Sequence, residues 1–177
     1  MQQKYHDSTH LYNPGGDYLY MATEETHDAA LRRHLTKLLN GGEAHISFDD
    51  LVEGFPVNRC GKEIEGLPYT AWQVLEHLQI AQFDIIEFAR NADYSSPEFP
   101  DGYWPKELGN EELWGTTVTK IRRDLEETVK IVSDPSTDLF ARIPHGTGQT
   151  WLRQAMLVAD HNAYHIGTLA AMKRLLK

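Results

Sequence analysis

Apolar residues recur at helical spacing in four stretches of this chain of 177 residues, and no stretch sustains the alternation of a β-strand. The stretch at about 71–91 has Leu75, Leu78, Ile85 and Phe88 on one side. Residues three, four or seven positions apart lie on one face of an α-helix. Further apolar residues cover more than half of its circumference, which is typical of a central, well-buried helix. The pattern predicts an all-α fold.

The first helix is expected from about Glu24 to Leu39, with Gly41 directly after it as part of a C-terminal stop. Its apolar stripe fits a period of 3.6 residues and consists of Leu31, Leu35, Leu38 and Leu39. Residues 1–22 are polar and contain the breaker Asn-Pro-Gly-Gly at 13–16. We therefore expect a polar N-terminal extension at 1–22 and a single domain at 23–177.

Polar capping residues mark where the other helices begin, because their side chains accept hydrogen bonds from unpaired N–H groups of the first turn. Thr70 precedes the second helix, Asn110 a third that extends to about Val132, and Thr150 a fourth that extends to the C-terminus. Long connections at 41–69, 92–109 and 134–149 join the four helices. In the first connection, apolar residues near Phe48 could form a short helix or pack over the bundle. Four helices with such connections favour a four-helix bundle.

Charge and cysteine content argue against several classes of protein. A formal net charge of −9 argues against nucleic acid or an anionic membrane as the main partner. Cys60 is the only cysteine, so the chain can form neither an intramolecular disulfide nor a cysteine zinc cage, and we expect an ordinary free thiol. No apolar run reaches the roughly 18 residues of a membrane span, and the first residues do not resemble a secretory signal. We therefore expect a cytoplasmic protein.

Two histidines four positions apart, His161 and His165, lie in the expected fourth helix beside the apolar positions Val158 and Met172. Residues at this spacing have Cβ atoms about 5–6 Å apart, so both rings can reach one metal ion at bond lengths of about 2.0–2.1 Å. A buried imidazole without a partner costs about 1–3 kcal/mol, so the pair needs hydrogen-bond partners or a metal. The spacing alone leaves both interpretations open, because a chain with nine histidines also produces such pairs by chance.

A third histidine, His77, lies in the most apolar helix, where a lone imidazole is otherwise poorly explained. A three-histidine site needs one ligand from a neighbouring helix, and His77 fits that role. The remaining histidines are weaker candidates. They are the pair His6 and His10 in the polar extension, His45 and His145 in loops, and His27 and His34, which are about 10.5 Å apart along one helix and cannot share a metal.

In these residues the chain resembles the DinB-like (DinB/YfiT) superfamily. The matching elements are Leu-Glu-His-Leu at 75–78 and, after a long gap, Asp-His-Asn-Ala-Tyr-His-Ile-Gly at 160–167, and the resemblance extends over about 24–177. It implies a four-helix bundle with an unusual connection order, often a homodimer, that binds zinc, nickel or iron through His77, His161 and His165. It also implies a hydrolase or thiol S-transferase that acts on a small molecule, which in some relatives is a low-molecular-weight thiol.

Three neutral imidazoles would leave a coordination position open for water or a substrate. Asp84, Glu76 and Asp160 are candidates to orient the ligand rings, with an ordinary solvated charge as the alternative for each. Tyr164 and Asn162 are either packing or pocket residues, and no catalytic residue is assigned. Three hypotheses follow: a metal-dependent hydrolase or thiol S-transferase, a metal-binding module without catalysis, and a helical interaction domain with histidines in its core.

Overall fold

The computed structural model describes residues 25–177, which contain five α-helices and no β-strand. The helices are α1 (His27–Asn40), α2 (Phe48–Val52), α3 (Ala71–Arg90), α4 (Glu111–Ser133) and α5 (Trp151–Leu175). The predicted all-α fold is confirmed, and the short α2 forms within the first long connection. Within 25–177 no helix is both long enough and apolar enough to cross a membrane.

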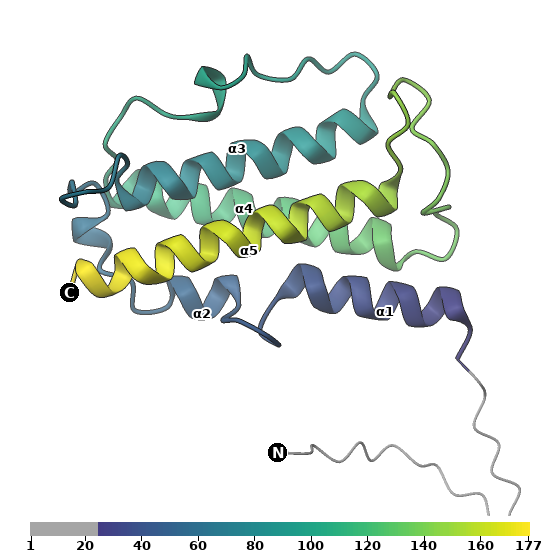
Figure 1. Ribbon diagram of the computed structural model, residues 1–177, viewed down its shortest axis with the longest axis horizontal. Helices are drawn as coiled ribbons and strands as arrows, with labels where there is room; N and C mark the ends of the chain where they lie inside the picture. Colours follow the sequence, from purple (N-terminus) through teal and green to yellow (C-terminus); the bar gives the residue numbers. More distant parts are fainter. Residues whose placement is uncertain (1–24) are drawn as a thin grey trace, which may run out of the picture.

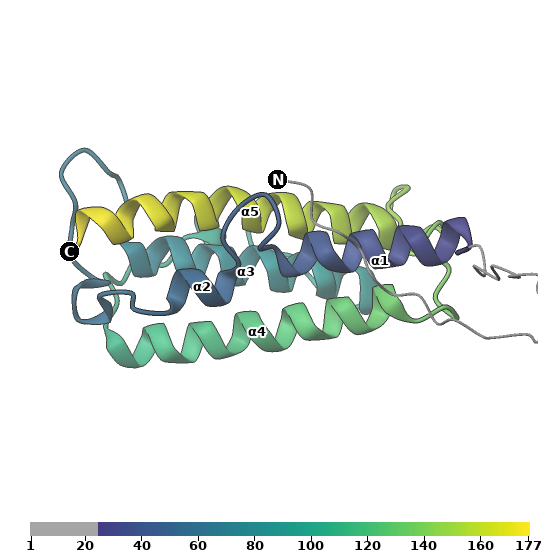
Figure 2. The ribbon, with the colours of Figure 1, turned by 90° about the horizontal axis from the view of Figure 1, so that it is seen from below.

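The four longer helices lie side by side, with α3 in contact with both α4 and α5 and with α1 packed on α4 and α5 (Figures 1 and 2). α3 and α4 run in the same direction, and α1 and α5 run in the opposite one. Because two consecutive helices are parallel, the connection 91–110 has to return along the length of α3, as Figure 1 shows.

The helix ends follow the predicted capping residues. The hydroxyl groups of Thr70 and Thr150 accept hydrogen bonds from backbone N–H groups three residues ahead, at 3.2 Å each, and the Asn110 side chain does so at 2.9 Å. Gly41 ends α1 with φ at 68°, a left-handed conformation that glycine adopts without steric cost. α1 begins at His27 after the cap Thr26, whereas the predicted start at Glu24 lies outside the described residues.

The interior consists of two apolar clusters separated by a layer of polar side chains. One cluster joins α2 to the N-terminal parts of α3 and α4 and the C-terminal part of α5. The other joins α1 to the C-terminal part of α3 and the N-terminal part of α5. Between them, the buried Asn162 amide donates to Gln82 at 2.7 Å, and Gln82 donates to the carbonyl of Ile121 at 3.0 Å. The histidines of α5 lie in this same layer.

The predicted inward face of α1 is wrong at one position. Leu38 is 53% exposed, whereas Leu35 and Leu39 are buried as expected. The buried face instead includes Arg32, which lies three positions before Leu35 and therefore on the same side of the helix. The Arg32 guanidinium donates to the carbonyl oxygens of Val132, Asp134 and Thr137, where α4 ends. A charged side chain thus belongs to the buried face of α1, whereas Leu38, which the apolar pattern placed on that face, lies exposed.

Candidate metal centre

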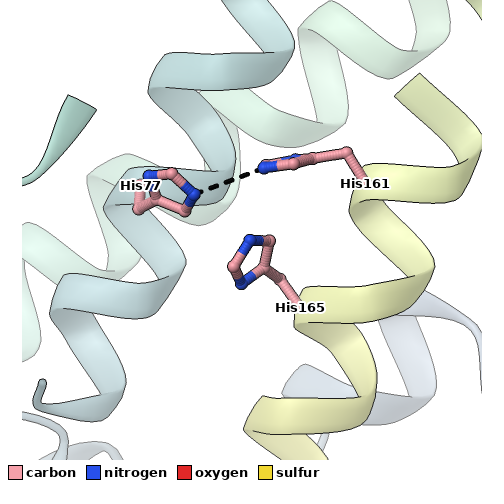
Figure 3. A group of neighbouring side chains, drawn as sticks. All are labelled: His77, His161 and His165. Atoms are coloured by element: carbon pink, nitrogen blue, oxygen red, sulfur yellow. Dashed lines mark hydrogen bonds between the residues drawn. The ribbon is translucent and has the colours of Figure 1, made fainter. Parts of the chain in front are cut away.

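Two antiparallel helices bring the three predicted histidines together. His77 lies in the N-terminal half of α3, and His161 and His165 lie one turn apart near the middle of α5. Figure 3 shows the three rings pointing toward one another across the space between these helices. One ring nitrogen of each residue lies within 4.8 Å of the others, which makes the group a cluster that could hold a metal ion.

Within the cluster, the Nε2 atoms of His77 and His161 lie 3.3 Å apart. Two ligands bound tetrahedrally at the zinc–nitrogen distance would be about 3.3–3.4 Å apart. The other separations stay within 4.8 Å, and the last torsion of a histidine side chain turns readily. To bind one ion, the nitrogens that are farthest apart would therefore have to approach each other by at most about 1.5 Å.

The backbone of the returning connection sets the protonation of His77. The Nδ1 atom of His77 lies 2.9 Å from the carbonyl oxygen of Tyr103, an acceptor, so Nδ1 carries the hydrogen. In the neutral ring Nε2 then holds a lone pair, and this is the atom that faces His161. A hydrogen bond of this kind to a carbonyl oxygen is the usual way in which proteins orient a metal-binding imidazole.

Stacked aromatic rings hold His77 from one side. The ring of Trp104 lies 3.9 Å from that of His77 with an interplanar angle of 1°, and Tyr69 stacks on Trp104 at 3.7 Å and 7°. Both aromatic residues belong to the long connections, Trp104 to the returning segment and Tyr69 to the segment before α3. Sequence patterns do not indicate Tyr69, Tyr103 or Trp104 as site residues, because no periodicity relates loop residues to a site on distant helices.

The three predicted carboxylates differ in their relation to the cluster. Asp84 accepts a hydrogen bond from the Tyr103 hydroxyl at 2.8 Å, so it anchors the residue whose carbonyl orients His77. Asp84 therefore acts on His77 only indirectly, through Tyr103. Glu76 accepts from Thr117 of α4 at 2.5 Å, and Asp160 is exposed. Only Asp84 is connected to a ligand candidate through hydrogen bonds.

Tyr164 and Asn162 have separate roles. Tyr164 is 73% exposed, and its ring meets that of His165 edge-on at 4.9 Å and 89°. Asn162 points to Gln82 in the polar layer and serves packing. The other described histidines, which are His27, His34, His45 and His145, are exposed and outside the cluster, and His6 and His10 lie outside the described residues.

Only some of the ring nitrogens in the cluster have a hydrogen-bond partner within residues 25–177. His77 has its carbonyl partner, but the buried Nδ1 atoms of His161 and His165 have none among the described residues. The interpretation of these histidines as core residues paired with carboxylates or carbonyls therefore fits His77 alone. Each ring on α5 thus keeps one buried nitrogen without a hydrogen-bond partner in the described part of the chain, so hydrogen bonds to carboxylates or carbonyls do not account for the burial of this pair.

Burial keeps the cluster uncharged. Burial, strengthened by neighbouring histidines, lowers the pKa of His165 to about 3 and that of His161 to about 4. Asp160 opposes the lowering of the pKa of His161. Burial also lowers the pKa of His77, and the hydrogen bond to the Tyr103 carbonyl opposes this shift. At neutral pH all three rings are deprotonated, which is the form that binds metals.

We expect the metal-free protein to lose stability as the pH falls from about 6.5 toward 4. The folded pKa values of His161 and His165 lie below the ordinary 6.5, so the unfolded chain binds more protons in this interval and acid favours it. Urea unfolding of the metal-free protein at about pH 7 and about pH 5 measures the loss. The double variant His161→Gln/His165→Gln should lose less stability over that interval. An equal loss of stability in both proteins would contradict the attribution of the pH dependence to His161 and His165.

Cys60 has the character expected of a buried, unreactive thiol. Its side chain is free and almost fully buried, and burial, together with Glu111, raises the pKa of the thiol. A thiol that stays protonated is a poor nucleophile. Nothing in its surroundings connects Cys60 to the histidine cluster.

A scan against protein-family models found no matching family, and searches of curated proteins and of solved structures found no significant match. Membership of the DinB-like superfamily therefore stays a prediction, which rests on the order of the histidines in the sequence.

Proposed function

We propose that this protein is a DinB-like metal-dependent protein in which His77, His161 and His165 hold one divalent metal ion, zinc, nickel or iron. The observation that carries the proposal is the convergence of three imidazoles from two antiparallel helices, with the Nε2 atoms of His77 and His161 3.3 Å apart. His77 is already oriented for binding through its Nδ1 atom.

The helix arrangement supports the proposal. Four long helices with parallel α3 and α4 and a long returning connection agree with the four-helix bundle of unusual connection order that the resemblance implies. The same connection places Tyr103 and Trp104 against His77. In this proposal the connection order has a function, because it supplies the groups that orient one ligand.

A metal-dependent hydrolase or thiol S-transferase acting on a small molecule is the activity that fits best. When bound, a divalent metal would supply a Lewis acid that polarises an oxygen or stabilises a deprotonated thiol. The cluster contains no carboxylate, so the ligands leave the positive charge uncompensated and the site favours an anionic donor. Trp104 and Tyr69 would keep water away from one face of His77.

Elemental analysis of protein from metal-replete expression tests the site. We expect about one divalent metal per chain, the content of a tri-histidine centre, and far less in His77→Ala, His161→Ala and His165→Ala. His34→Ala, a change at an exposed helical histidine outside the cluster, should retain the metal. A low metal content that His161→Ala leaves unchanged would refute the site.

Turnover separates an enzyme from a metal-binding module without catalysis. Ester hydrolysis and thiol conjugation by the metal-loaded protein should disappear in His77→Ala and persist in His34→Ala. Stoichiometric metal without turnover of either substrate class would favour the non-catalytic module.

A further inference from the structure

An apolar pocket of about 260 Å³ opens beside the histidine cluster. The pocket and the cluster share His165, whose ring lines the pocket. Trp104 also lines the pocket, and its ring stacks on that of His77. A molecule in the pocket therefore touches one proposed metal ligand and the aromatic residue that holds another.

The pocket begins at His165 and extends about one helical turn away from the cluster. Val74, which lines it, precedes His77 by three residues on α3, and Thr168 follows His165 by three residues on α5. Residues three apart occupy the same face of a helix, and one turn advances about 5.4 Å along the axis. Because α3 and α5 are antiparallel, both steps lead in the same direction from the cluster.

The lining favours a flat apolar group. Tyr69, Trp104 and Tyr164 contribute aromatic rings, and Leu67 and Met172 contribute apolar side chains, while no Asp, Glu, Lys or Arg lines the pocket. An apolar cavity of about 150 Å³ is large enough to bind benzene. The present volume therefore accepts one aromatic ring with a short chain attached.

We infer that this pocket binds the aromatic or similarly apolar part of the substrate and so places its polar head group at His77, His161 and His165. The inference deepens the proposed function and depends on it for the chemistry of the head group only. Binding of the apolar part depends on the pocket itself and can be measured without metal.

Fluorine NMR titrations of metal-free protein with 4-fluorobenzyl alcohol and 2-fluoroethanol test the pocket, because both probes carry a hydroxyl group and only one carries a ring. We expect the ring compound to bind at least about tenfold more tightly, since even a single methylene in an apolar pocket is worth about tenfold or more. A preference below tenfold overturns the inference.

Two variants and one control locate the binding. Leu67→Asp places a charge at the pocket, and Thr168→Trp fills it, so each should weaken binding of 4-fluorobenzyl alcohol about fivefold or more. Leu38→Asp introduces the same charge at an exposed leucine of α1 outside the pocket and should change the affinity less than about twofold. Equal effects of Leu67→Asp and Leu38→Asp would place the probe elsewhere.

A paramagnetic metal tests whether pocket and metal centre form one site. Protein loaded with cobalt should relax the fluorine of bound 4-fluorobenzyl alcohol faster than protein loaded with zinc. Equal relaxation in samples that elemental analysis shows to be loaded overturns the inference and leaves the metal centre intact. Samples that take up no metal refute the proposed function, and the titrations of metal-free protein then decide the pocket alone.

Discussion

Zinc at about 1,000 times its dissociation constant is expected to stabilise the metal-free protein against unfolding by about 4 kcal/mol. For a chain of this length that corresponds to a rise in Tm of about 8–16 °C. The reason is that only the folded chain brings together His77 and His161, which are 84 positions apart in the sequence. Thermal unfolding followed by circular dichroism, with and without zinc, measures the rise.

Single histidine variants decide where that stabilisation originates. His161→Ala removes one ligand and should reduce the rise in Tm to about 2 °C or less, the effect of weak binding to both folded and unfolded chains. His34→Ala should keep the full rise, because the exposed His34 lies outside the cluster. A full rise in His161→Ala would mean that zinc binds elsewhere.

The helices could be predicted from the sequence because the signals for them are local. Thr70, Asn110 and Thr150 cap the helices that follow, because each side chain accepts a hydrogen bond from an N–H group only three residues ahead. The apolar content of 71–91 likewise predicted a central helix, and α3 is buried on several sides. Neither signal requires knowledge of a distant part of the chain.

The inward face of α1 could not be predicted in detail because a partner helix determines it. The local pattern makes Leu38 part of the apolar stripe and leaves Arg32 outside it, because leucine is usually buried and arginine usually exposed. The end of α4, however, presents carbonyl oxygens to the N-terminal part of α1, where Arg32 donates to them. The inward placement of Arg32 thus depends on a contact with Val132, which is 100 positions away in the sequence.

The candidate ligands could be predicted, whereas the groups that orient them could not. His77, His161 and His165 lie on helices, where spacing and apolar neighbours indicate which face they share. Tyr103 and Trp104 lie on a connection whose path along α3 follows from the parallel arrangement of α3 and α4. Local sequence does not encode that path, so it made Asp84 a candidate to orient a ligand ring but did not indicate its hydrogen bond with Tyr103.

Arg32→Met is expected to lower the free energy of unfolding by about 3 kcal/mol and Tm by about 6–12 °C. Methionine keeps much of the apolar stem but leaves the carbonyl oxygens of Val132, Asp134 and Thr137 without their charged donor. The positive charge that stabilises the C-terminal end of α4 is lost as well. Urea unfolding of the two proteins measures the difference.

The matched control is Arg122→Met, which breaks an exposed ion pair with Asp49 and should cost less than about 1 kcal/mol. Arg32 belongs to the end of the molecule where α1 meets the end of α4, and the histidine cluster is formed by α3 and α5 alone. Arg32→Met should therefore keep its metal content in elemental analysis while losing stability. A loss no larger than that of Arg122→Met would show that water replaces the guanidinium at these carbonyl oxygens, and a parallel loss of metal would show that the two regions are coupled.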